Sequence, residues 1–311
     1  MCNVLVLGGS YFIGRAIVHA LRDKSAHVSV LNRGTVPMEN PLVVQLTADR
    51  SKTSEMRSIL KNPFDVVVDV SALTQKDVKN FADAIDWCPE RYILISSGAV
   101  YDSRYGKAPF VENSNLGGDP VWAEYGVDKT EAEKEAVKQF KGDRVQILRP
   151  PYVYGPANYL DREQFIWSRI LKGAPIFVPA NSASQIQFCH VDVLAKIVAS
   201  MACDDFGSAG VYNIGEARGY TFHDYIRVLA RIAGKRPIVV DAPDQSVPAR
   251  DFFPFRDYSM LLDTSKLRKL LKTEHPALFE GMGETHKWMV KNNWIELNET
   301  EQETRWKANG R

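Results

Sequence analysis

The sequence predicts an α/β fold built on a doubly wound parallel sheet, with a smaller, interleaved C-terminal substrate lobe. Three observations lead to this prediction. Short β-branched runs alternate with amphipathic segments through the first half of the chain. These runs are apolar almost throughout, as expected for parallel strands that helices cover on both faces. A glycine cluster directly follows the first run, which is typical of the first turn in this fold class.

The predicted strands and helices alternate regularly. We expect strands over residues 4–7, 27–31, 42–45, 66–70, 92–96 and 145–148, and helices over 13–22, 54–60, 76–87 and roughly 120–141. The sequence Arg149-Pro150-Pro151 ends the last of these strands, because proline has no N–H to give to a sheet. A helix over 191–201 and a strand over 211–214 then return to the sheet.

The composition changes after Gly155, where aromatic and proline residues become frequent and the predicted strands become shorter. We therefore expect two domains that are interleaved in sequence. The sheet domain is expected to comprise residues 1–155 and 187–215, and the substrate lobe residues 156–186 and 216–296. The last segment, 297–311, is polar apart from Trp306, so we expect a tail that cannot become ordered without a partner surface.

Composition and charge narrow the class of protein. With 45% hydrophobic and 25% charged residues the chain can bury a large core, and a net charge of +1 gives no global field that would steer it onto nucleic acid or anionic lipid. The four cysteines lie far apart and show no metal-ligand spacing, so we expect reduced thiols and no metal. No apolar run approaches the ~20 residues that span a bilayer. These features predict a cytoplasmic protein without a membrane partner.

The glycine cluster is the first candidate binding site. The sequence Gly8-Gly9-Ser10-Tyr11-Phe12-Ile13-Gly14 lies between a predicted buried strand and a predicted helix. Gly8 allows a tight turn, and Gly9 or Gly14 lets the backbone approach a pyrophosphate at the helix N-terminus. This placement favours dinucleotide binding over a plain structural turn.

The end of the second predicted strand bears on the choice of cofactor. A cofactor without a 2′-phosphate is usually held there by a carboxylate, but this chain has Asn32 and Arg33. An amide followed by a guanidinium tolerates or attracts a phosphate, so NADP is favoured and NAD stays open. A solvated loop position is the alternative for Arg33. Asp49, after the third strand, is either an adenine contact or an ordinary turn residue.

Two further motifs form a candidate catalytic site. Tyr125 and Lys129 are four residues apart in a predicted helix, which places phenol and ammonium on one face, where the ammonium would lower the pKa of the phenol. Tyr125 could then exchange a proton with a substrate hydroxyl. The segment from Ser96 to Tyr101 follows the fifth strand, and strand carboxyl ends form the ligand crevice in such folds. A surface tyrosine beside a solvated lysine is the alternative.

The order of these motifs resembles the extended short-chain dehydrogenase/reductase superfamily, of the NAD-dependent epimerase/dehydratase type with its Rossmann fold. Tyr11 departs from the fingerprint, since the superfamily usually has glycine there. The glycine loop, with Asn32-Arg33-Gly34, is similar to the branch that contains chloroplast stem-loop-binding proteins and bacterial relatives. The resemblance implies that Ser97 orients the substrate oxygen, that Ser96 is structural, and that Tyr125 and Lys129 also contact the cofactor. It further implies cofactor contacts at Asp49, Arg50, Ser71 and Pro151.

The resemblance also bears on the reaction. Dehydratases of this group carry an Asp-Glu pair where this chain has Gly98 and Ala99, so water loss is disfavoured. An oxidoreductase or epimerase acting on a sugar or sugar-nucleotide hydroxyl is expected, with substrate contacts at Ser97, Tyr152 and Arg256 and with a homodimer as the resembling proteins form. A cofactor-binding scaffold or RNA-binding protein without turnover is the alternative. For His190 we expect packing near the junction of the lobes, and for Asp192 a helix cap.

Overall fold

A computed structural model of the chain describes residues 2–38, 40–180, 183–204, 208–272 and 274–308. The chain divides into two compact units. Unit 1 comprises Met1–Val153, Cys189–Ala217 and Leu262–His275; unit 2 comprises Tyr154–Phe188, Arg218–Leu261 and Pro276–Arg311. The assignment of 216–296 to the lobe as one piece therefore differs from the structure, because Leu262–His275 returns to unit 1. Within that segment, Leu267 is buried in the core of unit 1.

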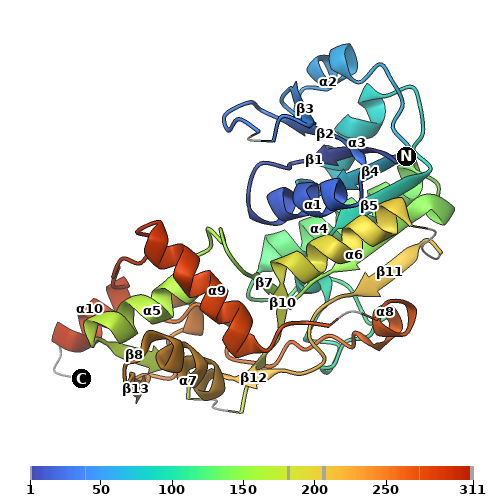
Figure 1. Ribbon diagram of the computed structural model, residues 1–311. Coiled ribbons are helices and arrows are strands. Elements are labelled where there is room, and N and C mark those ends of the chain that lie inside the picture. The colour runs from blue at the N-terminus through green and yellow to red at the C-terminus, as the bar shows by residue number, and fades with distance from the viewer. Residues whose placement is uncertain (1, 39, 181–182, 205–207, 273, 309–311) are drawn as a thin grey trace. The chain divides into compact units, whose positions relative to one another are not determined.

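Unit 1 is built on a seven-stranded parallel sheet, which confirms the predicted fold class (Figure 1). The strand order is β11-β6-β5-β4-β1-β2-β3, and each neighbouring pair runs parallel. The strands are β1 (Asn3–Leu7), β2 (His27–Asn32), β3 (Val43–Thr47), β4 (Val66–Asp69), β5 (Arg91–Ile95), β6 (Val145–Arg149) and β11 (Gly210–Asn213). The order reverses between β1 and β4, and in such sheets this point forms the ligand crevice at the carboxyl ends of the strands.

Helices cover both faces of this sheet. On one face α1 (Phe12–Asp23) packs beside α6 (Val191–Cys203), as Figure 1 shows, over inward side chains such as Val4 and Val6. On the other face α2 (Thr53–Ile59), α3 (Gln75–Ala84) and α4 (Ala123–Gln139) pack over Leu5 and Leu7. Successive side chains of β1 thus point to opposite faces of the sheet and pack in different cores, because side chains alternate along a strand. This double burial explains why β1 is apolar at every position from Val4 to Leu7.

Unit 2 contains three longer helices and small sheets. The helices are α5 (Glu163–Lys172), α7 (Phe222–Ala233) and α9 (Leu278–Lys291), and the short helix α8 (Ser265–Leu270) belongs to unit 1. The strands β8 (Pro175–Val178) and β13 (Ile238–Asp241) pair in parallel, whereas β9 (Gln185–Ile186) and β12 (Tyr220–Thr221) pair antiparallel. The chain first leaves unit 1 within β7 (Tyr152–Tyr154) and returns to it within β10 (Phe188–His190), and these two strands pair with each other.

The predicted polar tail is ordered from residue 301 to 308, where it forms α10 (Glu301–Ala308). Trp306 is buried, with its ring 5.0 Å from the rings of both Phe177 and Phe252. Glu303 forms a buried two-point ion pair with Arg169 of α5, at 2.7 and 2.6 Å. The sequence predicts that the tail needs a surface to become ordered, and unit 2 itself supplies that surface.

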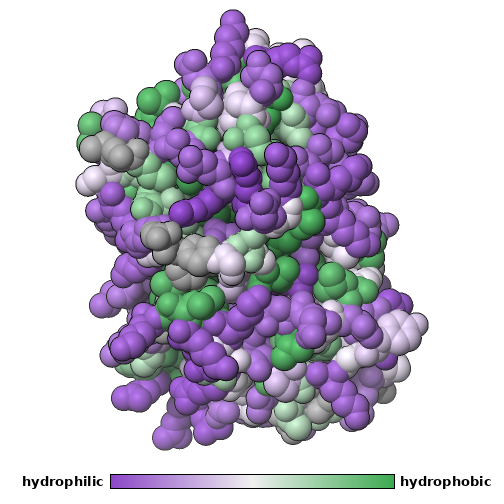
Figure 2. All heavy atoms as spheres, turned by 90° about the vertical axis from the view of Figure 1, so that its right-hand side faces the viewer, coloured by the Kyte–Doolittle hydropathy of each residue, from purple (hydrophilic) through white to green (hydrophobic). Residues whose placement is uncertain are grey.

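Polar side chains cover much of the molecular surface. On the face that Figure 2 shows, hydrophilic residues predominate and the hydrophobic ones form small separate groups. Within the described part of the chain, no helix has both the length and the apolar composition needed to cross a membrane.

Candidate active site

The glycine loop joins β1 to α1 through contacts that only glycine permits. A Cβ on Gly14 would lie 2.0 Å from the carbonyl oxygen of Gly8, and a Cβ on Gly9 would lie 2.8 Å from Val30. Gly8 has a φ of +90°, and a Cβ there would lie 2.7 Å from the Cβ of Ser71. The loops that follow β1 and β4 therefore touch at the crevice, with backbone rather than side chains at the start of α1.

The side chains of the loop leave this backbone accessible. Phe12 is buried, and Ile13 packs against the same core, so both anchor the start of α1. Tyr11 precedes the helix in an extended conformation and is 61% exposed. Its ring is therefore not packed into the loop.

Asn32 ties the end of β2 to the glycine loop. Its Nδ2 donates to Oγ of Ser10 at 2.8 Å, while its Oδ1 accepts from the N–H of Gly34 at 2.8 Å and from Nε2 of Gln45 at 2.9 Å. The backbone N–H of Gly34 can only donate, which fixes the orientation of the Asn32 amide. Both lone pairs of Oδ1 are thus used, and Asn32 can offer a ligand only its remaining N–H donor.

The two residues expected near the adenosine lie at the surface. Arg33 is exposed, and Asp49 forms a turn in which its carboxylate accepts from the N–H of Ser51 at 2.9 Å. This hydrogen bond, together with the positive charges of Lys52 and Arg33, lowers the pKa of Asp49. The turn role that the sequence left open for Asp49 is present in the structure.

Arg50 is expected to contact the cofactor, but the structure commits it to a buried cluster. Its guanidinium forms two hydrogen bonds with the carboxylate of Asp69, at 2.8 and 3.0 Å, and donates to Oγ of Ser71 at 2.6 Å. The Tyr92 hydroxyl also donates to Asp69, at 2.7 Å. Burial would raise the pKa of Asp69, but the Arg50 charge and these hydrogen bonds lower it. The cluster therefore fixes the loop after β4.

Lys129 joins two strand ends from its place on α4. Its Nζ donates to the carbonyl oxygen of Ala72 at 2.8 Å and to that of Ile95 at 2.6 Å, and the residue is only 2% exposed. Burial lowers the pKa of Lys129 to about 8, although the charge of Asp69 opposes the shift. Two of the three N–H donors of the ammonium are thus used by the protein, and one is left for a ligand.

The segment with Ser97 lies directly against the first turns of α4. Ser97 precedes a short 3-10 helix, η1 (Gly98–Val100), and its Oγ accepts from the N–H of Ala99 at 3.1 Å, which leaves its O–H as a donor. A Cβ on Gly126 would lie 2.2 Å from the carbonyl oxygen of Ala99. Gly126, which follows Tyr125, therefore lies directly against Ala99, which is two positions after Ser97.

Tyr125 itself is 41% exposed, near the start of α4. Gly126, beside Tyr125, determines how closely α4 approaches η1, and the sequence did not single it out. The signal for it is a glycine next to a tyrosine within a helix. Only a residue without a Cβ lets α4 approach η1 so closely. Two hydroxyl groups, from Ser97 and Tyr125, and the ammonium of Lys129 are thus carried by contacting segments at the carboxyl end of the sheet.

Ser96, directly after β5, ties the carboxyl end of the sheet to α4. It is buried and donates through Oγ to Glu133, at 2.5 Å. Glu133 also forms a buried two-point ion pair with Arg149, at 2.9 and 2.5 Å. This chain of contacts links the ends of β5 and β6 to α4, so it holds the helix that carries Tyr125 in register with the sheet.

The remaining predicted residues lie in different places. Pro151 and Tyr152 are half-buried just beyond β6, in unit 1. Arg256 is buried in unit 2, with its guanidinium carbon 5.7 Å from the centre of the Tyr258 ring. The cap of α6 is His190, whose Nδ1 accepts from the N–H of Asp192 at 3.3 Å. Asp192 was expected to be the cap, but the cap lies two residues earlier, at His190, which places Asp192 in the first turn of the helix.

Comparisons with known proteins agree with this geometry. The sequence profile described as "NAD dependent epimerase/dehydratase family" matches residues 4–215. The chain belongs to this family. Its match begins at β1 and runs to the residues just after β11, so it spans the seven-stranded sheet together with the glycine loop, Ser97, Tyr125 and Lys129.

Individual relatives of the family cover most of the chain. The chloroplast stem-loop binding protein of 41 kDa b of Arabidopsis thaliana is 28% identical over 86% of this chain and 74% of its own. The dTDP-4-dehydro-6-deoxy-D-allose reductase of Streptomyces bikiniensis is 26% identical over 92% of this chain and 95% of its own. Among solved structures, MoeE5 in complex with UDP-glucuronic acid and NAD superposes with a TM-score of 0.74 at 22% identity, covering 93% of this chain and 99% of its own.

The residues present fit the dinucleotide that the family name implies. The glycine loop leaves no side chain between β1 and the first turn of α1, where helix geometry leaves amide donors and a positive dipole end for a phosphate. The close packing of Gly8 against Ser71 brings the loop after β4 to the same seat. Beside the carboxyl ends of β4 and β5, Lys129 has one N–H donor left, which suits a ribose hydroxyl. The chain therefore has a coherent set of donors along the crevice.

Proposed function

We propose that this chain is a NAD(P)-dependent oxidoreductase or epimerase that acts on a hydroxyl-bearing carbon of a sugar or sugar nucleotide. The observation that carries the proposal is the contact of Gly126 with Ala99, which joins the segments of Tyr125 and Ser97 above the anchored Lys129. The substrate class is supported by the relatives, since one is named as a reductase of a dTDP-sugar and one solved neighbour holds UDP-glucuronic acid and NAD.

The bound nicotinamide would supply a hydride acceptor or donor. In the oxidative direction the substrate C–H bond gives up a hydride, its O–H bond gives up a proton, and a carbonyl forms. Oη of Tyr125 takes the proton, and Oγ of Ser97 holds the substrate oxygen by a hydrogen bond. The Lys129 ammonium favours the phenolate by its positive charge. Gly98 and Ala99 offer no carboxyl group for removing water, so the proposal excludes dehydration by an acid-base pair at that place.

We further propose NADP as the preferred cofactor, with NAD as the alternative. Support comes from the end of β2, where no carboxylate is available and where Oδ1 of Asn32 already accepts two hydrogen bonds. A ribose 2′-hydroxyl would find no acceptor in Asn32, whereas a phosphate needs only donors. The exposed Arg33 adds a positive charge beside this place.

The test is the Tyr125→Phe variant, assayed with a panel of UDP- and dTDP-sugars by the absorbance of the reduced nicotinamide. The exposed ring loses only its hydroxyl, so we expect turnover to fall by at least about 100-fold while dinucleotide titration is unchanged. Ser97→Ala serves as the second variant, since it removes the oxygen-orienting hydroxyl, together with the hydrogen bond that this hydroxyl accepts from Ala99. Equal turnover by wild type and Tyr125→Phe would refute the proposal.

RNA binding without turnover is a second candidate, favoured by the name of the Arabidopsis relative. It predicts salt-sensitive retention of a stem-loop RNA and no turnover with any nucleotide sugar, and a net charge of +1 weighs against it. Retention of RNA with equal affinity at low and high salt, or turnover that Tyr125→Phe abolishes, would decide against this candidate. The homodimer and the cytoplasmic location stay predictions from the sequence.

A further inference from the structure

A buried chain of hydrogen bonds leads from Arg50 to the ammonium of Lys129 within unit 1. Arg50 forms a two-point ion pair with the carboxylate of Asp69, which is fully buried at the end of β4. Oδ1 of Asp69 also accepts from the backbone N–H of Ala72 at 2.9 Å. The carbonyl oxygen of Ala72 in turn accepts from Nζ of Lys129 at 2.8 Å. Ala72 is thus held by Asp69 at its N–H group and holds Lys129 at its C=O group.

The carboxylate of Asp69 is surrounded by donors. One oxygen accepts from Arg50 and from the backbone N–H groups of Ser71 and Ala72, and the other accepts from Arg50 and from the hydroxyl of Tyr92. Burial alone would raise the pKa of Asp69, but the charge of Arg50 and these hydrogen bonds lower it. Asp69 therefore keeps its negative charge in a fully buried place, directly before the loop that holds Lys129.

The charge of Asp69 acts on the protonation of Lys129 as well as on its place. Burial lowers the pKa of Lys129 to about 8, and the largest charge effect on it is that of Asp69, which opposes the shift. Glu133 on α4 and Asp77 on α3 act in the same direction as Asp69, whereas the positive charge of Arg50 lowers the pKa further. Removal of Asp69 and removal of Arg50 should therefore change the protonation of Lys129 in opposite directions.

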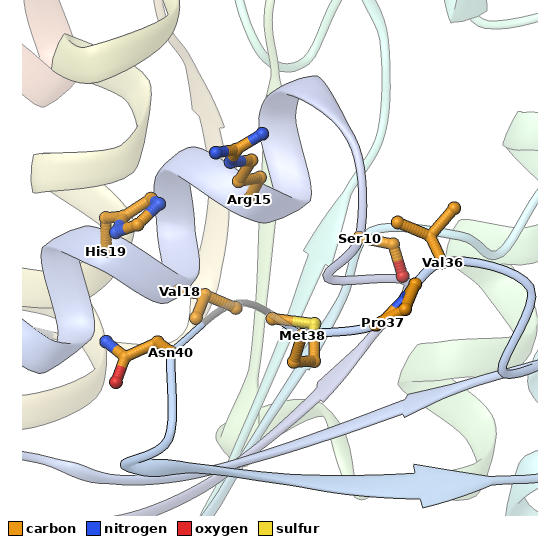
Figure 3. Close-up of a pocket in the computed structure, with 8 residues that line it drawn as sticks. All are labelled: Ser10, Arg15, Val18, His19, Val36, Pro37, Met38 and Asn40. Atoms are coloured by element: carbon orange, nitrogen blue, oxygen red, sulfur yellow. The ribbon is translucent and has the colours of Figure 1, made fainter.

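The ionisable side chains of α1 lie apart from this cluster. Figure 3 shows Arg15 and His19 projecting from α1, beside a pocket that the loop after β2 borders. Helix α1 packs on the opposite face of the sheet from α3 and α4. The charges that act most strongly on Lys129 therefore come from the face of α3 and α4 and from the strand ends, and Asp69 is the one that also fixes its anchor.

We propose that Asp69 is a positioning residue for Lys129: it fixes the carbonyl group of Ala72 that holds the ammonium, and its negative charge keeps the ammonium protonated. The inference rests on the proposed function, in which that ammonium favours the phenolate of Tyr125. Asp69 acts through Lys129 and not on the reacting atoms. Arg50 holds Asp69 in place, while its own charge disfavours the ammonium.

The experiment measures the protonation of Lys129 in three backgrounds of the full-length protein: the wild type, Arg50→Met, and Arg50→Met combined with Asp69→Asn. Each background is unfolded with urea at a series of pH values, with and without Lys129→Met, and the difference gives the contribution of Lys129 to the free energy of unfolding. Comparing the last two backgrounds tests the charge of Asp69, because neither contains a buried guanidinium that has lost its carboxylate. In Arg50→Met the carboxylate keeps three donors, from Ser71, Ala72 and Tyr92, so this background should fold.

The contribution of Lys129 rises with pH above the pKa that it has in the folded protein, which is about 8 in the wild type. In Arg50→Met the rise should begin at a higher pH than in the wild type. With Asp69→Asn added, it should begin at least about 1 pH unit lower than in Arg50→Met alone. Lys129 is then mostly a neutral amine at pH 8, so kcat at that pH should fall at least about fivefold between these two backgrounds, while KM changes by less than about threefold.

The matched control is Asp83→Asn, which removes an exposed aspartate of α3 that pairs with Lys79. It should change neither the pH at which the Lys129 contribution rises nor kcat. If Asp69→Asn leaves that pH where it is, or moves it without lowering kcat, Asp69 does not position Lys129 for catalysis and the inference is wrong. If the wild type turns over no nucleotide sugar, the proposed function fails, and the unfolding comparison still decides whether Asp69 keeps Lys129 charged.

Discussion

Lys129 should make the stability of the protein depend on pH in a way that one substitution removes. Burial lowers its pKa from 10.5 to about 8. This shift means that folding disfavours the ammonium form relative to the neutral amine by about 3 kcal/mol of free energy. Between these two pH values the unfolded chain still binds the proton that the folded chain has released. The unfolded state then carries more protons, so the contribution of Lys129 to the free energy of unfolding rises with pH.

The size of the effect follows from the same values. From pH 7 to pH 10 the free energy of unfolding of the wild type should rise relative to that of Lys129→Met by about 2.5 kcal/mol, with a slope that stays below about 1.4 kcal/mol per pH unit. Methionine cannot titrate, and subtracting the two proteins cancels every other ionisable group. Urea unfolding of both proteins at a series of pH values, followed by tryptophan fluorescence, measures the difference.

The control is Lys134→Met, which removes an exposed lysine from the same helix. Its difference from the wild type should stay flat over the same range, because that ammonium remains in water on folding. A flat difference for Lys129→Met as well would show that the Lys129 ammonium is not buried against the carbonyls of Ala72 and Ile95. It would also remove the physical basis for its action on Tyr125.

Two further predictions concern the glycine loop and the C-terminal helix. Gly14→Ala places a Cβ 2.0 Å from the carbonyl oxygen of Gly8, so it should destabilise the protein by about 1–3 kcal/mol and abolish dinucleotide binding. Gly283→Ala on α9 meets no atom within 4 Å and should stabilise by up to about 1 kcal/mol; similar melting temperatures for the two variants would contradict this account. Glu303→Gln leaves Arg169 buried beside a neutral amide, so it should cost about 3 kcal/mol and speed hydrogen exchange in residues 301–308 without affecting dinucleotide titration. Unchanged protection of that segment would mean that the ion pair does not hold α10.

The sequence predicts the sheet of unit 1 well because its signals are local. The run that was expected over 4–7 is β1 (Asn3–Leu7), and the helix expected over 13–22 is α1 (Phe12–Asp23). An apolar strand next to an amphipathic helix shows its period within a few residues. The glycine loop is equally local, since the turn and the helix that follows it lie in one short segment.

The features that the sequence does not show depend on partners that lie far away in sequence. Arg50 stands beside Asp49 in what looks like a ligand-binding turn, but its partner Asp69 is 19 residues further on. The clue was an aspartate at the end of a strand that is otherwise all valine, because a buried carboxylate needs a partner. The order of the tail was missed for the same reason, since Glu303 meets Arg169 across 134 residues. Composition alone cannot show that such a partner exists.

The interleaving of the two units has a consequence for synthesis on the ribosome. The edge strand β11 and the helix α6 come from residues 191–213, and the segment Leu262–His275 that completes unit 1 comes later still. The nascent chain therefore cannot complete the sheet when its first six strands have emerged, because α1 alone then covers the face that it later shares with α6. Folding of unit 1 must wait for most of unit 2 to be translated, so a chaperone that shields the exposed valines of β1 and β4 would act during this interval.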